Sequence, residues 1–334
     1  MILAGDIGGT KTVIGLFEAD GNRLHVIREE TFPSQSYGSL EAILNQFMGP
    51  GSAASLSVAC FGVAGPIIEG TSRATNLPWE LDERSLAEAF RLPRVKLLND
   101  LEAAAYGMLH LDPTDLCVLQ PGPPRKGNIV VIAAGTGLGE AILYWDGTRY
   151  HPMATEGGHT DFGPRSDLEI GLLRYLQREY GRVSYERVLS GPGLFNIYRF
   201  LRDSGIAQEP EWLRKRIAED DPGAVISEIG LTGDDPLCTK ALELFVSVYG
   251  AEAGNLALKA FAIGGVYIGG GIAPKILVEA RGHMPLRTAF TRAFTDKGRF
   301  ADLLRSIDVR VALNLRTPLL GAAHYGLMLL GRHS

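Results

Sequence analysis

The chain has 334 residues, of which 46% are hydrophobic and 21% charged, so it is long enough for two globular domains with full cores. Its formal net charge of −5 argues against non-specific binding to nucleic acid or to an anionic membrane surface. The three cysteines, Cys60, Cys117 and Cys238, form no CxxC or Cys/His cluster, so we expect neither a structural zinc nor a disulfide framework. No basic residue precedes Lys11, and the apolar stretch over 260–274 is short and glycine-rich. We therefore expect a cytoplasmic protein without a membrane span.

Two glycine turns mark an internal repeat. The N-terminus has strand-like runs on both sides of GDIGGT (5–10), and Asp20-Gly21 predicts a hairpin to a third strand. Residues 129–151 follow the same order: a strand enters the turn Gly135–Gly137, and Asp146-Gly147 predicts the next hairpin. The two segments are offset by 126 residues. They predict a duplicated α/β unit with a cleft between the copies.

After each hairpin the pattern changes to strands that alternate with helices, which is typical of an α/β fold. In the first half we expect helices over 39–47, 82–90 and 101–110 and buried strands over 56–65 and 94–98. In the second half we expect a helix from Ser166 to Gly181, a long helical region over 236–261, and strand, glycine turn and helix over 265–277. Proline, glycine and charge gather over 111–127, which we take as the domain boundary.

The glycine turns are candidate phosphate-binding sites. GDIGGT joins two strands, so it is neither a P-loop ending in GK[ST] nor a dinucleotide fingerprint, both of which open a helix. Its glycines let backbone N–H groups approach an anion, while Thr10 can donate its hydroxyl and Asp6 can hold Mg²⁺ through water. For either turn alone, a tight hairpin with a polar tip explains the residues equally well. Two such turns facing one cleft favour a nucleoside triphosphate, with the triple glycine of 268–275 as a flat wall for an adenine.

Asn99-Asp100 stands where the strand RVKLL ends and the helix-like LEAAAYG begins. One interpretation is structural, because Asn and Asp are good helix N-caps. The other is catalytic, because open α/β sheets bind ligands at the carboxyl ends of their strands, where Asp100 would act as a base.

Other hydrogen-bonding residues suit a sugar, whose hydroxyls donate and accept at once. They are Asn76, Glu156, His159 and Glu186. Taken singly, His159 is as well explained as a surface histidine and Glu186 as a partner of a helix dipole. The Gly157-Gly158 pair between Glu156 and His159 indicates a backbone with unusual dihedral angles.

These motifs together resemble the bacterial glucokinases of the hexokinase–actin–chaperone ATPase superfamily over nearly the whole chain. GDIGGT and IAAGTGLGEA look like the two phosphate motifs, VYIGGGIAPK like the adenosine motif, and LLNDLEAAAYG like the segment with the catalytic Asp. EGGHTDFGP and YERVLSGPGL look like the glucose-binding segments, and GAAHYGL like the closing helix. The region just after His159, HTDFGPRSDLEIG (159–171), contains no cysteine, which favours the zinc-free branch over the related repressor-and-kinase sugar family.

The resemblance implies an α/β, two-domain, duplicated ribonuclease-H-like (actin-like ATPase) fold with mixed central sheets and an interdomain cleft. The domains implied are 1–110 with a C-terminal helix at about 316–331, and 111–315. The implied function is ATP-dependent phosphorylation of D-glucose to glucose 6-phosphate by a cytoplasmic homodimer with Mg²⁺, and Asp100 both caps its helix and acts as general base. Alternatives are a kinase for mannose or an N-acetylated amino sugar, or a non-catalytic hexose and nucleotide sensor.

The resemblance also assigns residues to both ligands. Those assigned to the sugar are Asn76, Asn99, Asp100, Glu156, His159 and Glu186. Those assigned to the nucleotide are Gly5, Asp6, Ile7, Gly8, Gly9, Thr10, Gly135, Thr136, Gly137, Gly269 and Gly270.

Overall fold

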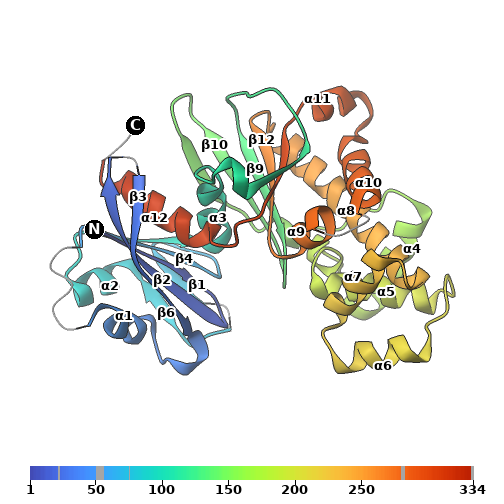
Figure 1. Cartoon of the computed structure of the whole chain (residues 1–334), viewed down its shortest axis with the longest axis horizontal. Helices are drawn as coiled ribbons and strands as arrows, with labels where there is room; N and C mark the ends of the chain where they lie inside the picture. Colours follow the sequence, from blue (N-terminus) through green and yellow to red (C-terminus); the bar gives the residue numbers. More distant parts are fainter. Residues whose placement is uncertain (22, 50–55, 75, 280–282, 332–334) are drawn as a thin grey trace. The chain divides into compact units, whose positions relative to one another are not determined.

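The computed structural model describes residues 1–21, 23–49, 56–74, 76–279 and 283–331 (Figure 1). The chain divides into two compact units. The first contains residues 1–114, 152–154 and the C-terminal segment from Asn314, and the second contains 115–151 and 155–313. No described helix is both long and apolar enough to cross a membrane.

The first unit is built on a mixed five-stranded sheet of order β3-β2-β1-β4-β7. Its strands are β1 (Ile2–Ile7), β2 (Lys11–Asp20), β3 (Arg23–Pro33), β4 (Val58–Val63) and β7 (Val95–Asn99). β1, β2 and β3 are antiparallel neighbours, whereas β1, β4 and β7 run parallel. The short strands β5 (Thr71–Arg73) and β6 (Glu80–Asp82) form a separate pair.

Helices cover the sheet of the first unit on both faces, and alternate strand residues enter two different cores. The helices are α1 (Leu40–Met48), α2 (Glu83–Phe90), α3 (Asp100–Met108) and α12 (Thr317–Leu329), with single turns η1 (Ser34–Ser36) and η3 (Pro113–Asp115). Ile2 and Ala4 of β1 belong to the core with α3 and α12, whereas Leu3 belongs to the core with α1 and α2. This period of two is that of a strand, and burying each large aliphatic side chain contributes roughly 1.5–3 kcal/mol.

The second unit repeats the sheet, in the order β11-β10-β9-β12-β13-β8. Its strands are β8 (Leu116–Gln120), β9 (Ile129–Ala134), β10 (Leu138–Trp145), β11 (Tyr150–Ala154), β12 (Gly265–Gly269) and β13 (Val309–Ala312). β9 pairs antiparallel with β10 and parallel with β12, as β1 does with β2 and β4. The predicted duplication is confirmed, with antiparallel β8 as an addition at one edge.

A large helical layer completes the second unit. Its helices are α4 (Asp167–Tyr180), α5 (Gly191–Asp203), α6 (Glu211–Glu219), α7 (Pro222–Thr232), α8 (Pro236–Lys259), α9 (Ile272–Pro274), α10 (His283–Thr295) and α11 (Ala301–Arg305). Short turns are η4 (Gly157–His159), η5 (Tyr185–Arg187), η6 (Lys275–Glu279, a π-helical turn) and η7 (Gly298–Phe300). Asp235 caps α8, because its side chain accepts hydrogen bonds from the Leu237 and Cys238 N–H groups. The helix carries the buried Phe245 and Tyr249 into the core. The helices predicted over 39–47, 82–90 and 236–261 are all confirmed.

Candidate active site

Asn99, and not Asp100, caps helix α3. The Asn99 Oδ1 accepts from the N–H groups of Leu101 (3.0 Å) and Glu102 (3.3 Å), and the Glu102 carboxylate accepts from the Asn99 N–H (3.2 Å). This is a complete capping box. The Asn99 amide also donates to the Gly65 carbonyl at 3.1 Å. The expectation that Asp100 caps the helix is therefore wrong, because Asp100 is already the first helical residue.

Asp100 shares its surroundings with Asp6. Burial, and then the negative charge of Asp100, raise the pKa of Asp6 to about 6, while Lys11 opposes the shift. Asp6 lies near the end of β1, and Asp100 directly follows β7 at the start of α3. Because β1 and β7 both run parallel to β4, the two strand ends lie at the same edge of the sheet. Two carboxyl groups that disfavour each other's ionisation are a suitable place for a cation.

Hydrogen bonds from Ser34 fix the turn that follows β1. The Ser34 Oγ donates to the Gly8 carbonyl (2.7 Å), its N–H donates to the Thr10 carbonyl (3.0 Å), and its Oγ lies 2.9 Å from the Thr12 hydroxyl. Ser34 is fully buried, whereas Thr10 is exposed. The sequence reasoning missed Ser34, because it lies after β3, two strands beyond the turn, in a chain region with no motif.

Asn76 lies in the connection between β5 and β6 and is exposed. Its φ of 63° places it in the left-handed region, which Asn tolerates better than most residues. This backbone requirement alone accounts for an Asn at this position.

The second unit brings Glu156, His159 and Glu186 together. The His159 Nε2 lies 3.9 Å from the Glu156 Oε2, and its Nδ1 lies 3.9 Å from the Glu186 Oε1. These separations are too long for direct hydrogen bonds. The three side chains remain 57%, 64% and 32% exposed for His159, Glu156 and Glu186, so their polar atoms converge while still open to a ligand.

The glycines between Glu156 and His159 are required by close packing. Neither Gly157 nor Gly158 has a positive φ, so the expectation of unusual dihedral angles is wrong. A Cβ on Gly157 would lie 2.0 Å from the Glu140 Oε2, and one on Gly158 would lie 2.0 Å from the Leu138 carbonyl oxygen. Only glycine therefore lets η4 lie directly on β10.

Glu186 connects the sugar candidates to the second glycine turn. Its Oε2 accepts a hydrogen bond from the Leu138 N–H at 3.0 Å, and a Cβ on Gly137 would lie 2.5 Å from the same oxygen. The turn itself is closed by the Gly135 N–H donating to the Gly137 carbonyl at 2.8 Å. The residues predicted for a sugar and for a phosphate are thus immediate neighbours in this unit.

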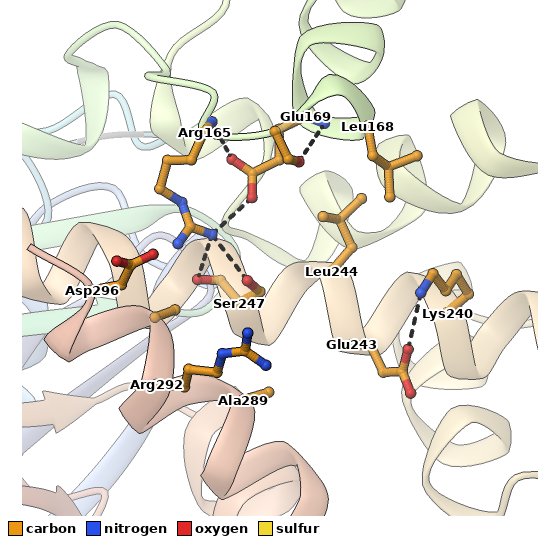
Figure 2. Close-up of a pocket in the computed structure, with 12 residues that line it drawn as sticks. Arg165, Leu168, Glu169, Lys240, Glu243, Leu244, Ser247, Ala289, Arg292 and Asp296 are labelled. Atoms are coloured by element: carbon orange, nitrogen blue, oxygen red, sulfur yellow. Dashed lines mark hydrogen bonds and ion pairs between the residues drawn. The ribbon is translucent and has the colours of Figure 1, made fainter.

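Two arginines fix the segment that carries His159. The Arg182 Nε donates to Asp161 at 2.7 Å, and its guanidinium also donates to the His159 carbonyl. Arg165, which follows this segment in the chain, donates hydrogen bonds to Glu169 (2.7 Å) and to Ser247 on α8 (2.9 Å). These residues line a cavity of about 370 Å³ (Figure 2). That cavity is lined by charges of both signs. Its arginines were not found from the sequence because arginine positions carried no spacing signal.

A larger cavity of about 650 Å³ lies beside the second glycine turn. It is lined by Gly135, Thr136, Gly191, Pro192, Leu194, Asp221, Gly223, Ala224, Ser227, Glu228, Leu231, Gly271, Ile272, Lys275 and Ile276. From the triple glycine it is Gly271 that lines the cavity. Gly270 has a φ of 79°, and a Cβ there would lie 2.3 Å from the Ala134 carbonyl oxygen, so this glycine allows β12 to end close to β9. The α7 residues of the wall were missed by the sequence reasoning.

No group of three or more His, Cys, Asp or Glu side chains within the described ranges could hold a metal ion by itself. Of the cysteines, Cys60 and Cys238 are buried and Cys117 is half-buried.

Comparison with known proteins gives the family. A family model described as Glucokinase matches residues 3–328. The glucokinase of Nostoc sp. is 43% identical over 97% of this chain and 98% of its own length. Among solved structures, a glucokinase from an Antarctic psychrotroph has a TM-score of 0.84 and 31% identity, covering 98% of each chain. The glucokinase of Balamuthia mandrillaris in complex with glucose shares the fold, with a TM-score of 0.75 and 22% identity over 98% of this chain and 93% of that one. The expected duplicated actin-like ATPase fold is confirmed, and this chain belongs to the glucokinase family.

Proposed function

We propose that this chain transfers the γ-phosphoryl group of ATP to the 6-hydroxyl of D-glucose, with Asp100 as the general base. One observation carries the proposal. Glu186 borders the Gly135–Gly137 turn on one side and the Glu156–His159 pair on the other, so a polyol site and an anion site meet at one carboxylate. A kinase requires this adjacency, because its acceptor alcohol and its terminal phosphate must touch.

The sugar is bound by Glu156, His159 and Glu186 through its hydroxyl groups. Carboxylates accept hydrogen bonds from hydroxyls, and an imidazole can accept or donate, so the cluster matches a hexose. The Asn99 side-chain oxygen accepts the hydrogen bonds of the helix cap, and one N–H of its amide donates to the Gly65 carbonyl. The second N–H of that amide can donate to a sugar oxygen. Asn76 remains a proposed contact on the resemblance alone.

The nucleotide occupies the cavity beside Gly135 and Thr136. A volume of about 650 Å³ with the apolar walls Leu194, Leu231 and Ile272 suits a purine nucleoside. The glycine turn at the edge of that cavity offers backbone N–H groups to the phosphates. This arrangement favours a nucleotide donor over a polyphosphate chain, which has no use for an apolar pocket.

In the transfer step, the sugar oxygen attacks the γ-phosphorus while the bond to the ADP oxygen breaks. The hydroxyl proton passes to the Asp100 carboxylate. Position at the first turn of α3 favours the ionised form of that carboxylate, because the N-terminal end of a helix carries partial positive charge. Gly5–Thr10 and Gly135–Gly137 then orient the phosphates with their backbone N–H groups.

Mg²⁺, which the resemblance implies, fits the Asp6 and Asp100 pair. The charge of Asp100 disfavours ionisation of Asp6, and a hard divalent cation relieves that repulsion. Asp6 would hold the ion, which would neutralise charge on the donor phosphates.

The test is Asp100→Asn, assayed for glucose 6-phosphate with MgATP. Turnover should fall by roughly 10²–10⁴-fold, the range for a positioned base, while calorimetry still detects glucose binding. Asp82→Asn is the matched control, because Asp82 caps α2, another helix of the same unit, and Asn preserves its cap to the Ser85 N–H. Near-normal turnover in Asp100→Asn would refute the role of Asp100.

A panel of sugars separates the related activities. Faster turnover with mannose or an N-acetylated amino sugar would reassign the acceptor. Hexose-independent ATP hydrolysis without sugar phosphate would replace the kinase by an ATPase or sensor. The homodimer and the cytoplasmic location stay predictions.

A further inference from the structure

Glu140 is a buried acid that the proposed reaction does not use. It belongs to β10, its exposed fraction is 1%, and its backbone carbonyl accepts a hydrogen bond from the Thr155 hydroxyl at 2.8 Å. Its Oε1 has no hydrogen-bond partner among the residues that the structure describes. A buried carboxylate in this state is costly, whereas a neutral carboxyl group tolerates an unpaired oxygen far better.

The Glu140 carboxyl group packs directly against η4, the turn proposed to bind the sugar. The close approach of Gly157 to its Oε2 leaves no room for a Cβ between them. On the outer side of the same turn, the side chains of Glu156 and His159 are exposed. η4 therefore covers the Glu140 Oε2 with Gly157 and turns the side chains of Glu156 and His159 to solvent.

Burial and the charge of Glu252 on α8 disfavour ionisation of Glu140. Burial, and then the negative charge of Glu252, raise the pKa of Glu140 to about 7, and Lys259 opposes the shift. The Lys259 Nζ donates a hydrogen bond to the Glu252 Oε1 at 3.2 Å. Lys259 thus faces two buried acids, and a second cation, Lys297, also interacts with the charge of Glu252. Ionisation of Glu140 would place a second buried negative charge beside Glu252.

The titratable and charged groups on the surrounding elements are Tyr249, Glu252 and Lys259 on α8, Glu156 and His159 at η4, and Tyr185 and Glu186 at η5. Tyr249 donates to the Ile132 carbonyl (3.3 Å) and accepts from the Ala134 N–H (3.1 Å), so its hydroxyl is occupied. Histidine side chains titrate in the same range as Glu140. Only a difference between two pH profiles can therefore isolate Glu140.

We propose that Glu140 is a positioning residue for the sugar: its neutral form supports the turn that presents Glu156 and His159, and its ionisation releases that turn. This inference rests on the proposed function, since it assigns the turn to sugar binding. Glucose affinity then falls as Glu140 ionises, because only the molecules in which Glu140 is neutral hold the turn in the conformation that binds glucose. Between pH 6 and pH 8 the Kd for glucose should rise by up to about tenfold from this cause.

The test is the Kd for D-glucose by calorimetry at pH 6, 7 and 8, for the unaltered chain and for Glu140→Gln. Gln imitates the neutral acid in size and charge, so the variant should lose the part of the pH dependence that Glu140 causes. Glu252→Gln should move the midpoint of the profile to lower pH, because it removes the like charge beside Glu140. The control is Glu209→Gln: this carboxylate is also largely buried in the second unit, yet it binds Arg202 and Arg214. It should keep the unaltered profile.

The outcomes are separable. If Glu140→Gln binds glucose with the same pH dependence as the unaltered chain, the positioning role is wrong. If the unaltered chain binds no glucose at any pH, the proposed function fails first. Should Glu140→Gln not fold, an unshifted midpoint in Glu252→Gln overturns the proposal by itself.

Discussion

At the scale of single residues, Asn99 and Asp100 divide two tasks. Asn99 satisfies two N–H groups of the first turn of α3 and the Gly65 carbonyl, and it is 8% exposed. Asp100 follows it on the helix and is thereby placed where its carboxylate is electrostatically favoured. The geometry of the proposed base therefore depends on a neighbour that does no chemistry itself.

Asn99→Ala tests this dependence. The change removes the cap and leaves the Gly65 carbonyl without its donor, so unfolding should be easier by about 1–3 kcal/mol in urea titrations. The control is Ser39→Ala, which removes an exposed cap of α1 whose hydrogen bond is 3.4 Å long. Its cost should be about 0.5–1 kcal/mol. Equal losses in the two variants would contradict the role given to Asn99.

At the scale of elements, the ends of α5 and α7 build the nucleotide cavity. Ser190 caps α5 through the Gly193 N–H, and Asp221 caps α7 through the Ala224 N–H. A Cβ on Gly223 would lie 2.9 Å from the Gly191 carbonyl oxygen, so a glycine there lets the two helix starts touch. The cavity wall is consequently fixed by backbone contacts, and its side chains can vary without loss of shape.

Ala224→Trp should block this cavity. Ala224 lines it and is exposed, so a large ring can enter the space without disturbing the core. KM for ATP should rise at least tenfold, while the Kd for glucose stays within about twofold, because the pocket holds the nucleoside only. Ala218→Trp, on exposed α6 outside the cavity, is the matched control. An unchanged KM for ATP in Ala224→Trp would place the nucleotide elsewhere.

At the scale of the whole molecule, duplication produces two similar sheets with different additions. In the first unit α12 packs on α3 so closely that a Cβ on Gly321 would lie 1.7 Å from the Ala103 carbonyl oxygen. The second unit carries its acids inside the core, where Glu140 is 1% and Glu252 0% exposed. Ionisation of Glu140 therefore affects the stability of the protein as well as the proposed site.

The pH dependence of stability follows from the sign of this shift. The pKa of Glu140 is raised from its ordinary value of 4.5 to about 7, so the folded state holds its proton more tightly than the unfolded state. Stability is then lost as pH rises from about 4.5 to about 7, by up to roughly 3 kcal/mol. The Tm advantage of Glu140→Gln over the unaltered chain should be larger at pH 8 than at pH 5. Burial raises the pKa of Glu209, but Arg214, Tyr198 and Arg202 together outweigh it and lower that pKa. Glu209→Gln should therefore lose stability at pH 8 instead. A Tm difference independent of pH in Glu140→Gln would exclude a neutral acid.

Local signals in the sequence determined the repeat and the elements that carry its motifs, whereas α5, α6, α7, α10, β8 and β13 were not predicted. Apolar periodicity, Asp-Gly hairpins and glycine turns act over ten residues or fewer, and the structure has them where they were predicted. The residue types also singled out Glu156, His159 and Glu186, and the structure places His159 3.9 Å from each of the two carboxylates.

Only the tertiary structure decided what each of these residues touches. Ser34, Glu140 and Arg182 all act on neighbours more than ten positions away, and no local pattern distinguishes them from other polar residues. The reason for Gly157 was also hidden, because the space for a Cβ is taken by a side chain from another strand. Sequence thus determined the local conformation, whereas burial, charge coupling and steric exclusion arose when distant segments packed together.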